Sequence, residues 1–131
     1  MTRTLWAHAA WVALASAFNA GSWMALSEGQ PGWAGPGVGT AQAGVLVMGL
    51  VVGLGLAGWT KAYRGAAGCI AAVLLIGGVG RHLVADPAGY ASWGTRLAGV
   101  GVNLFGVCGF AWGAVRGLDR QAQPTGGSDR S

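Results

Sequence analysis

Four long apolar runs, almost free of charged residues, constrain this chain more than any other feature of its sequence. They cover residues 5–26, 43–59, 65–85 and 96–115. A segment that crosses the hydrocarbon core must satisfy its backbone amides internally, as a helix of about 20 mostly apolar residues or as a strand of a closed barrel. None of the runs shows the alternation over about 10 residues that is typical of barrel strands. The sequence therefore predicts four transmembrane helices.

The composition supports a membrane protein. Charged residues make up 9% of the chain, against about 25% in soluble domains, which need charges to coat their surface. Apolar residues make up 53%, which excludes a disordered chain, and 26 glycines fit closely packed helices in lipid. We expect an all-α fold, an integral membrane four-helix bundle over residues 1–116, followed by a disordered polar tail over residues 117–131.

The charges of the connectors predict the orientation. Lysine and arginine gather at both termini and in the turn between the second and third runs, at Arg3, Lys61, Arg64, Arg116 and Arg120. Glu28 and Asp86 occupy the other two loops. Because cytoplasmic connectors collect Lys and Arg, both termini are expected on the cytoplasmic side of the membrane. Arg81 and Arg96, near the outer side, run against this rule.

The start of the chain admits a second interpretation, a cleavable signal peptide. Arg3, the apolar stretch after it and the triplet Ala15-Ser16-Ala17 imitate the regions of such a signal. His8 interrupts the stretch, and the apolar character continues to Leu26. These two features favour a retained first span.

Small residues recur at intervals of four in every span. Because lipid offers helices no hydrophobic reason to associate, such stripes predict close packing within the chain, against a partner subunit or against a second copy. The stripes are Ala9, Ala13, Ala17, Gly21 and Ala25 in the first span, Gly49, Gly53 and Ala57 in the second, Gly68 and Ala72 in the third, and Gly109, Gly113 and Gly117 in the fourth.

The spans lack the groups that most membrane chemistry requires. All four carboxylates lie outside them, whereas ion-coupled transporters generally need one inside the membrane. His8 and His82 fall on opposite sides of their span centres, roughly 20 Å apart along the membrane normal, so one haem cannot take both. Cys69 and Cys108 are expected to be small buried residues. We predict no catalytic residue, no metal site and no nucleic-acid partner.

A few polar residues fall at one depth in the outer half of the membrane. Asn19, Arg81, His82 and Asn103 lie about 4–10 Å outward of their span midpoints. Asp86, one helical turn after His82, could reach back to it or to Arg81 before Pro87 stops the helix. These five residues are the candidate ligand-binding site, for a quinone head group, an anion or a lipid head group. Alternatively, Arg81 extends to the outer head groups and the asparagines link helices.

The stretch from residue 40 to residue 116 resembles a family of small bacterial four-span membrane proteins of unknown function, distantly similar to the DoxX-like group. The residues that produce the likeness are Ala43-Gly44, Gly53-Leu54-Gly55-Leu56, the basic turn, Gly77-Gly78-Val79-Gly80-Arg81 and Asp86. The resemblance implies a four-helix bundle in the inner membrane of a bacterium and points to Arg81 and Asp86. DoxX-like proteins include a membrane subunit of a quinone-reducing oxidoreductase, which suggests a quinone as the ligand.

The sequence leaves three functional hypotheses, with no cofactor predicted beyond a possible quinone. The first is a non-enzymatic accessory or anchor subunit that contacts membrane lipids and a partner membrane subunit or a second copy. The second is a quinone- or small-ligand-binding subunit of a redox enzyme. Small-solute transport ranks third, because the spans contain no carboxylate.

Overall fold

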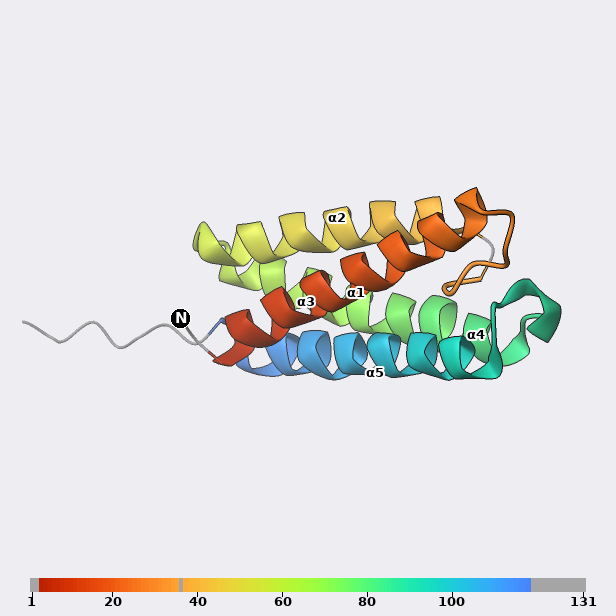
Figure 1. Cartoon of the computed structure of the whole chain (residues 1–131). Coiled ribbons are helices and arrows are strands. Elements are labelled where there is room, and N and C mark those ends of the chain that lie inside the picture. The colour runs from red at the N-terminus through yellow and green to blue at the C-terminus, as the bar shows by residue number, and fades with distance from the viewer. Residues whose placement is uncertain (1–2, 36, 119–131) are drawn as a thin grey trace, which may run out of the picture.

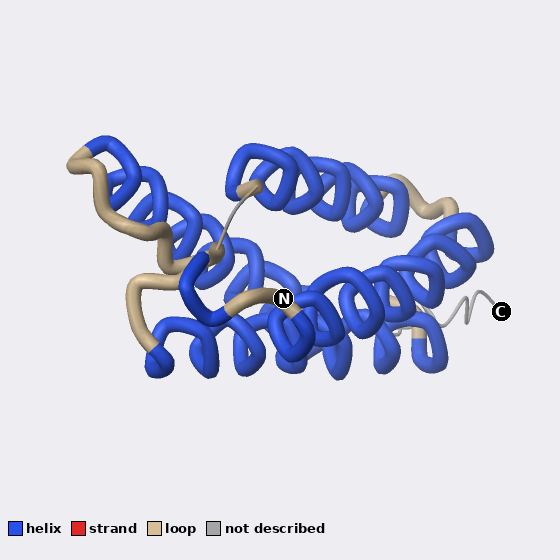
Figure 2. Tube along the Cα trace, turned by 90° about the vertical axis from the view of Figure 1, so that its right-hand side faces the viewer, coloured by secondary structure: helices blue, strands red, loops and turns tan. Residues whose placement is uncertain are grey.

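The computed structural model describes residues 3–35 and 37–118, and every regular element in that part of the chain is helical (Figure 2). The first two long helices are α1 (Arg3–Ser27) and α2 (Val38–Leu56). The third span joins α3 (Thr60–Val73), the π-helical segment η1 (Leu74–Gly80) and α4 (Arg81–Val84). A short 3-10 turn, η2 (Pro87–Gly89), precedes α5 (Trp93–Arg116).

The described part of the chain contains four helices that are long and apolar enough to cross a bilayer. They start at Arg3, Val38, Thr60 and Trp93, with α3, η1 and α4 counted as one helix. The predicted all-α four-helix bundle is therefore confirmed, and the chain is a multi-pass membrane protein. The predicted tail lies outside the described residues from position 119 onward.

The helices are antiparallel neighbours (Figure 1). The start of α1, the turn between α2 and α3, and the end of α5 lie at one end of the bundle, and the loops after α1 and α4 lie at the other. Helix α1 runs obliquely between α2 and α5. Helix α2 packs against α1 and α3, whereas α3 and η1 both pack along α5.

The connector between the second and third spans differs from the prediction. Lys61 and Arg64 were expected in a turn, but both belong to the start of α3. The chain reverses over residues 57–59, where Gly58 adopts φ 89°. A positive φ is costly for any residue with a Cβ. The glycine at this position therefore permits a turn shorter than the one predicted from the positions of Lys61 and Arg64.

Both ends of α5 have recognisable capping residues. Ser92 forms a capping box with Thr95, whose backbone amide donates to the Ser92 hydroxyl at 3.0 Å. At the other end Gly117, with φ 74°, ends the helix. Gly117 is buried, and Leu118 packs against the core. These two residues were assigned to the disordered tail, and that boundary is wrong because Leu118 has an apolar surface to cover.

The core lies between α3 and α5 and extends to α1 and α2. Tyr63 and Phe110 are its largest fully buried apolar side chains. The ring of Trp11 packs edge-on against Phe110, with ring centroids 5.5 Å apart. Buried side chains of α2, such as Val52, complete the cluster.

The predicted small-residue stripes of the first two spans do not form the helix contacts. Ala9, Ala13 and Ala17 are exposed, as are Gly49 and Gly53. A Cβ built on either of these glycines would meet no atom within 4 Å. Of the three alternatives, packing within the chain is therefore wrong for these residues, and packing against a partner subunit or a second copy stays a prediction.

The close contacts use a different glycine pattern, on α5. Gly99, Gly106 and Gly113 are buried and lie seven residues apart. A Cβ at these positions would collide with the rings of His82, Trp11 and Tyr63, respectively. Glycine is thus used where an aromatic or imidazole ring of another helix lies against the backbone of α5.

Candidate ligand-binding site

The inner face of α1 is its more polar face. The buried residues recur at intervals of three and four, as expected for one side of a helix. They are Thr4, His8, Trp11, Ala15, Asn19, Ser22 and Ala25. The outer face of the bundle lies against lipid, which offers no hydrogen-bond partners. Polar side chains therefore find such partners only in the interior. The polar face of α1 therefore faces the other helices.

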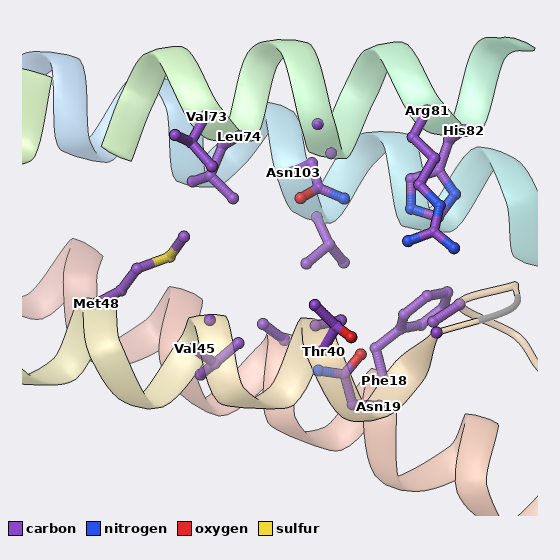
Figure 3. A pocket seen from close by; sticks show the side chains of 18 of the residues that line it. Phe18, Asn19, Thr40, Val45, Met48, Val73, Leu74, Arg81, His82 and Asn103 are labelled. Carbon is purple, nitrogen blue, oxygen red and sulfur yellow. The ribbon is translucent and has the colours of Figure 1, made fainter. Parts of the chain in front are cut away.

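A cavity of about 260 Å³ lies among the helices in the half of the bundle that contains the loops after α1 and α4. Asn19, Arg81, His82 and Asn103 all line it (Figure 3). They come from α1, from α4 and from α5, and α2 supplies Thr40, Val45 and Met48. The structure thus brings together the four residues that the sequence placed at one depth, out of the five predicted to form the site.

Asn19 is held by a chain of side-chain hydrogen bonds between α1 and α2. Its amide nitrogen donates to Gln42 Oε1 at 3.0 Å, and Gln42 Nε2 donates to Ser16 Oγ at 3.4 Å. Gln42 lies just before the apolar run over residues 43–59, and it is helical because α2 begins at Val38. The two helices are therefore joined by amides at the polar end of the cavity.

His82 has a defined partner. Its Nδ1 lies 2.9 Å from the hydroxyl of Tyr90, and both side chains are buried. The imidazole rests on Gly99, where a Cβ would stand 2.8 Å from Nε2. Tyr90, in the loop that precedes α5, thereby orients the imidazole next to the cavity, and the absence of a side chain at Gly99 gives the ring its space.

Arg81 lines the cavity beside the start of α2. In Figure 3 its guanidinium points from α4 across the cavity toward α1 and α2. A Cβ on Gly37 would lie 3.0 Å from one guanidinium nitrogen. Gly37 adopts φ 93° before α2 begins, so the backbone and the arginine can approach each other closely.

Asn103 faces Gly78 of η1. Its amide nitrogen donates to the carbonyl oxygen of Gly99 on its own helix at 2.8 Å. A Cβ on Gly78 would collide with the Asn103 amide. The π-helical segment and its glycine therefore leave room for an amide between the third span and α5, and such π segments frequently accompany functional sites.

Asp86 does not join this group. Its carboxylate accepts a hydrogen bond from the backbone N–H of Ala88 at 2.9 Å and caps η2. It does not line the cavity. The expected return of Asp86 to His82 is wrong, because the chain turns into an extended conformation at Ala85 and His82 pairs with Tyr90 instead.

Arg96 was considered only as a charge near the outer side. Its side chain is 6% exposed, and its Nε and one terminal nitrogen donate to the carbonyl oxygens of His82 and Leu83 at 2.5 and 2.7 Å. The guanidinium also lies over the ring of Trp93, 4.8 Å from its centroid. Arg96 therefore caps the end of α4 and supports the backbone of His82.

The opposite end of the cavity is apolar. Val45, Met48 and Leu74 are buried there. Trp11 lies beside them and donates its indole N–H to the carbonyl oxygen of Val102 at 3.0 Å. The cavity therefore has hydrogen-bonding groups and a guanidinium at one end and a hydrocarbon lining at the other.

Two loops cover the polar end. The hydroxyl of Ser22 accepts a hydrogen bond from the N–H of Ala34, which lines the cavity. The N–H of Ala91 donates to the carbonyl oxygen of Gly32 at 3.4 Å, which joins the loop after α1 to the loop before α5. Together the loops cover this end of the bundle.

The remaining chemically interesting residues lie elsewhere. His8 is at the other end of α1, where its Nε2 lies 3.3 Å from the Tyr63 hydroxyl. Cys69 and Cys108 are exposed on the helix surface, so the expectation that they are buried is wrong. Among the described residues, no group of three or more His, Cys, Asp or Glu side chains could hold a metal ion.

Several contributors to the site were not identified from the sequence, namely Gln42, Tyr90, Arg96 and the glycines beneath the rings. The spacing of polar residues on the first span is a usable signal, because His8, Trp11, Asn19 and Ser22 are three, eight and three residues apart, which places them on one face of a helix. Tyr90 offered no such signal, since it lies in a loop whose position depends on the bundle.

Comparisons with known proteins add no assignment to this geometry. No family model, no curated protein and no solved structure matches the chain.

Proposed function

We propose that this protein binds the head group of a small, acceptor-rich ligand, a quinone in the first instance, as a membrane subunit of a bacterial redox complex. The observation that supports this proposal is the convergence of Asn19, Arg81, His82 and Asn103 on one cavity. It favours the ligand-binding hypothesis over a plain anchor, for which no interior cavity with polar groups is needed.

The chemistry of the lining suits a quinone. The described residues that line the cavity include Arg81 and no carboxylate, so the ligand is expected to supply oxygen acceptors. The guanidinium of Arg81 is a charged donor, and hydrogen bonds from a charged donor are about twice as strong as neutral ones. The ring of the ligand would rest against the apolar end of the cavity, near Trp11 and Met48.

Trp11 provides an internal reporter, because quinones quench indole fluorescence at close range. The experiment uses a variant in which Trp11 is the single tryptophan, reconstituted in lipid nanodiscs and titrated with decylubiquinone. We expect saturable quenching. Loss of a charged hydrogen bond costs about 1.5–3 kcal/mol, so Arg81→Ala should weaken binding by roughly ten- to a hundredfold.

Arg116→Ala is the matched control, because Arg116 lies at the other end of the bundle, away from the cavity. Its guanidinium lies over the ring of Trp112. For this test Trp112 is replaced together with the other tryptophans. Quenching that rises linearly without saturation, or an unchanged affinity in Arg81→Ala, contradicts the proposal.

The proposal includes an orientation with both termini in the cytoplasm of a bacterium. Arg96 caps a helix inside the bundle and Arg81 lines the cavity, so neither counts as a loop charge. This supports the orientation that follows from Lys61, Arg64 and the termini. In a cysteine-free background, Gln30→Cys should react with an impermeant maleimide on intact cells, and Lys61→Cys should react only after lysis. The reverse pattern contradicts it.

An accessory or anchor role remains a second candidate, and one observation favours it. The exposed ridge of Ala9, Ala13 and Ala17 leaves a flat strip of α1 on which another helix could pack closely. Crosslinking in native membranes should then recover a partner subunit or a second copy. Recovery of the uncrosslinked 13.1 kDa monomer alone contradicts the anchor role.

A further inference from the structure

The cavity opens on one side. Its exposed lining residues lie either at the start of α2, at Gly37, Thr40 and Ala41, or on the facing stretch of the third span, at Val73, Gly77 and Arg81. The lining residues from α1 and α5 are buried or half-buried. We call this opening, between the first half of α2 and η1, the lateral mouth (Figure 3).

The lateral mouth lies between two of the helices that are long and apolar enough to span a membrane. At 1.5 Å per residue, Ala41 and Gly44 are about 4 and 9 Å along α2 from its start at Val38. On the third span the mouth is apolar at Val73, which is 61% exposed, and next to it at Ile76, which is 76% exposed, whereas Arg81 forms its polar end. The apolar part of the opening is therefore the part that faces hydrocarbon.

In the other directions the lining is less exposed, apart from Gly37 and Arg81 at the polar end. The loop after α1 covers the polar end. There the N–H of Ala34 donates to the Ser22 hydroxyl, and the N–H of Ala91 donates to the carbonyl oxygen of Gly32. Trp11 and Met48 line the other end and belong to the hydrophobic core, which continues beyond them. The apolar part of the exposed lining, at Val73 and Gly77, is thus the direction in which a hydrocarbon tail can leave the cavity.

Small residues keep the lateral mouth wide. A Cβ built on Gly44 of α2 or on Gly77 of η1 would meet no atom within 4 Å. Helix α2 packs on α1 and α3, and η1 packs on α5, so the two sides of the mouth are held by different neighbours. The opening is therefore a consequence of how the helices pair.

We propose that the ligand is an amphiphile whose hydrocarbon tail leaves the cavity through the lateral mouth and lies among the lipid chains. This inference rests on the proposed function, since it concerns the ligand of the same site. The polar end holds the head group, and the apolar lining from Leu74 to the rim at Val73 follows the first part of the tail. The ligand class is a quinone with an alkyl or isoprenoid tail rather than a water-soluble quinone.

The test compares decylubiquinone with its tail-less parent quinone, using the quenching of Trp11 as the signal. Gly77→Leu and Gly44→Leu each place a side chain in the mouth, at positions where an added Cβ would meet no atom within 4 Å. The matched controls are Gly101→Leu on α5 and Gly49→Leu on α2, which are exposed, lie outside the cavity and have equal space for a Cβ. Dissociation constants are measured at equilibrium, corrected for partition into the lipid.

We expect each mouth variant to weaken the binding of decylubiquinone at least tenfold and that of the tail-less quinone less than threefold. The control variants should change neither dissociation constant. If both variants bind decylubiquinone as the parent protein does, the tail does not use the mouth and the inference is wrong, although the site stands. The inference is also wrong if the tail-less quinone loses as much affinity. If the parent protein binds neither quinone, the proposed function fails, and the inference fails with it.

Discussion

Arg64 and Arg96 cap the carboxyl ends of each other's helices. Arg64, at the start of the third span, donates to the carbonyl oxygens of Ala114 and Val115 of α5 at 2.7 and 2.9 Å. Arg96, at the start of α5, donates to those of His82 and Leu83 at the end of the third span. The antiparallel pair is thus fixed at both ends, and the orphan carbonyls of two helix termini are satisfied by cations.

Arg96→Met should destabilise the protein by about 1–3 kcal/mol, because it leaves buried carbonyl oxygens without donors. Arg116→Met is the control, since Arg116 is exposed and its contact with Trp112 is worth about 0.5–1 kcal/mol. Unfolding in a mild detergent against increasing sodium dodecyl sulfate measures both. Equal losses for the two variants would show that the cap of α4 contributes little.

Gly106→Ala should destabilise the bundle, because its methyl group would collide with the indole of Trp11. Overpacking of this kind costs about 1–3 kcal/mol. Gly101→Ala is on the same helix with open space around it, so the helix preference for alanine should leave stability unchanged or slightly higher. The same unfolding measurement compares the two variants. An unchanged free energy of unfolding in Gly106→Ala would contradict the close packing of Trp11 against Gly106.

The hydrogen bond between Asn19 and Gln42 should couple α1 to α2. In membranes such bonds contribute about 0.6 kcal/mol on average and up to about 1.7. A double-mutant cycle with Asn19→Leu and Gln42→Leu should give a coupling free energy of that size. The cycle of Gln42 with Asn103, which bonds its own helix, should give none, and equal coupling in both cycles would count against a direct bond.

Tyr90→Phe should cost about 0.5–1.5 kcal/mol, because it removes the hydroxyl that pairs with His82 at 2.9 Å. It should also weaken quinone binding, since the imidazole loses its orienting partner. Tyr63→Phe is the matched control for binding, because Tyr63 pairs with His8 far from the cavity. A loss of affinity equal in both variants would assign the effect to stability rather than to His82.

The membrane-spanning helices could be predicted because their apolar length is a property of each segment taken alone. The depth of Asn19, Arg81, His82 and Asn103 could also be predicted, since it follows from position along a helix of fixed rise. Their meeting at one cavity depends in addition on the rotation of each helix about its axis. In lipid the outer face is as apolar as the core, so hydrophobicity does not reveal that rotation.

The sequence alone determined the solvent, the four spans and the depth of the polar groups, because these depend on local composition and length. Only the tertiary structure decided which glycines touch another helix, why Arg96 is buried, and that Asp86 caps a turn instead of joining the site. Each of these is a contact between segments distant in the chain. The side chains of His82, Trp11 and Tyr63 pack on Gly99, Gly106 and Gly113, respectively, because of how the helices pair. That pairing is the part of the fold that no single segment encodes.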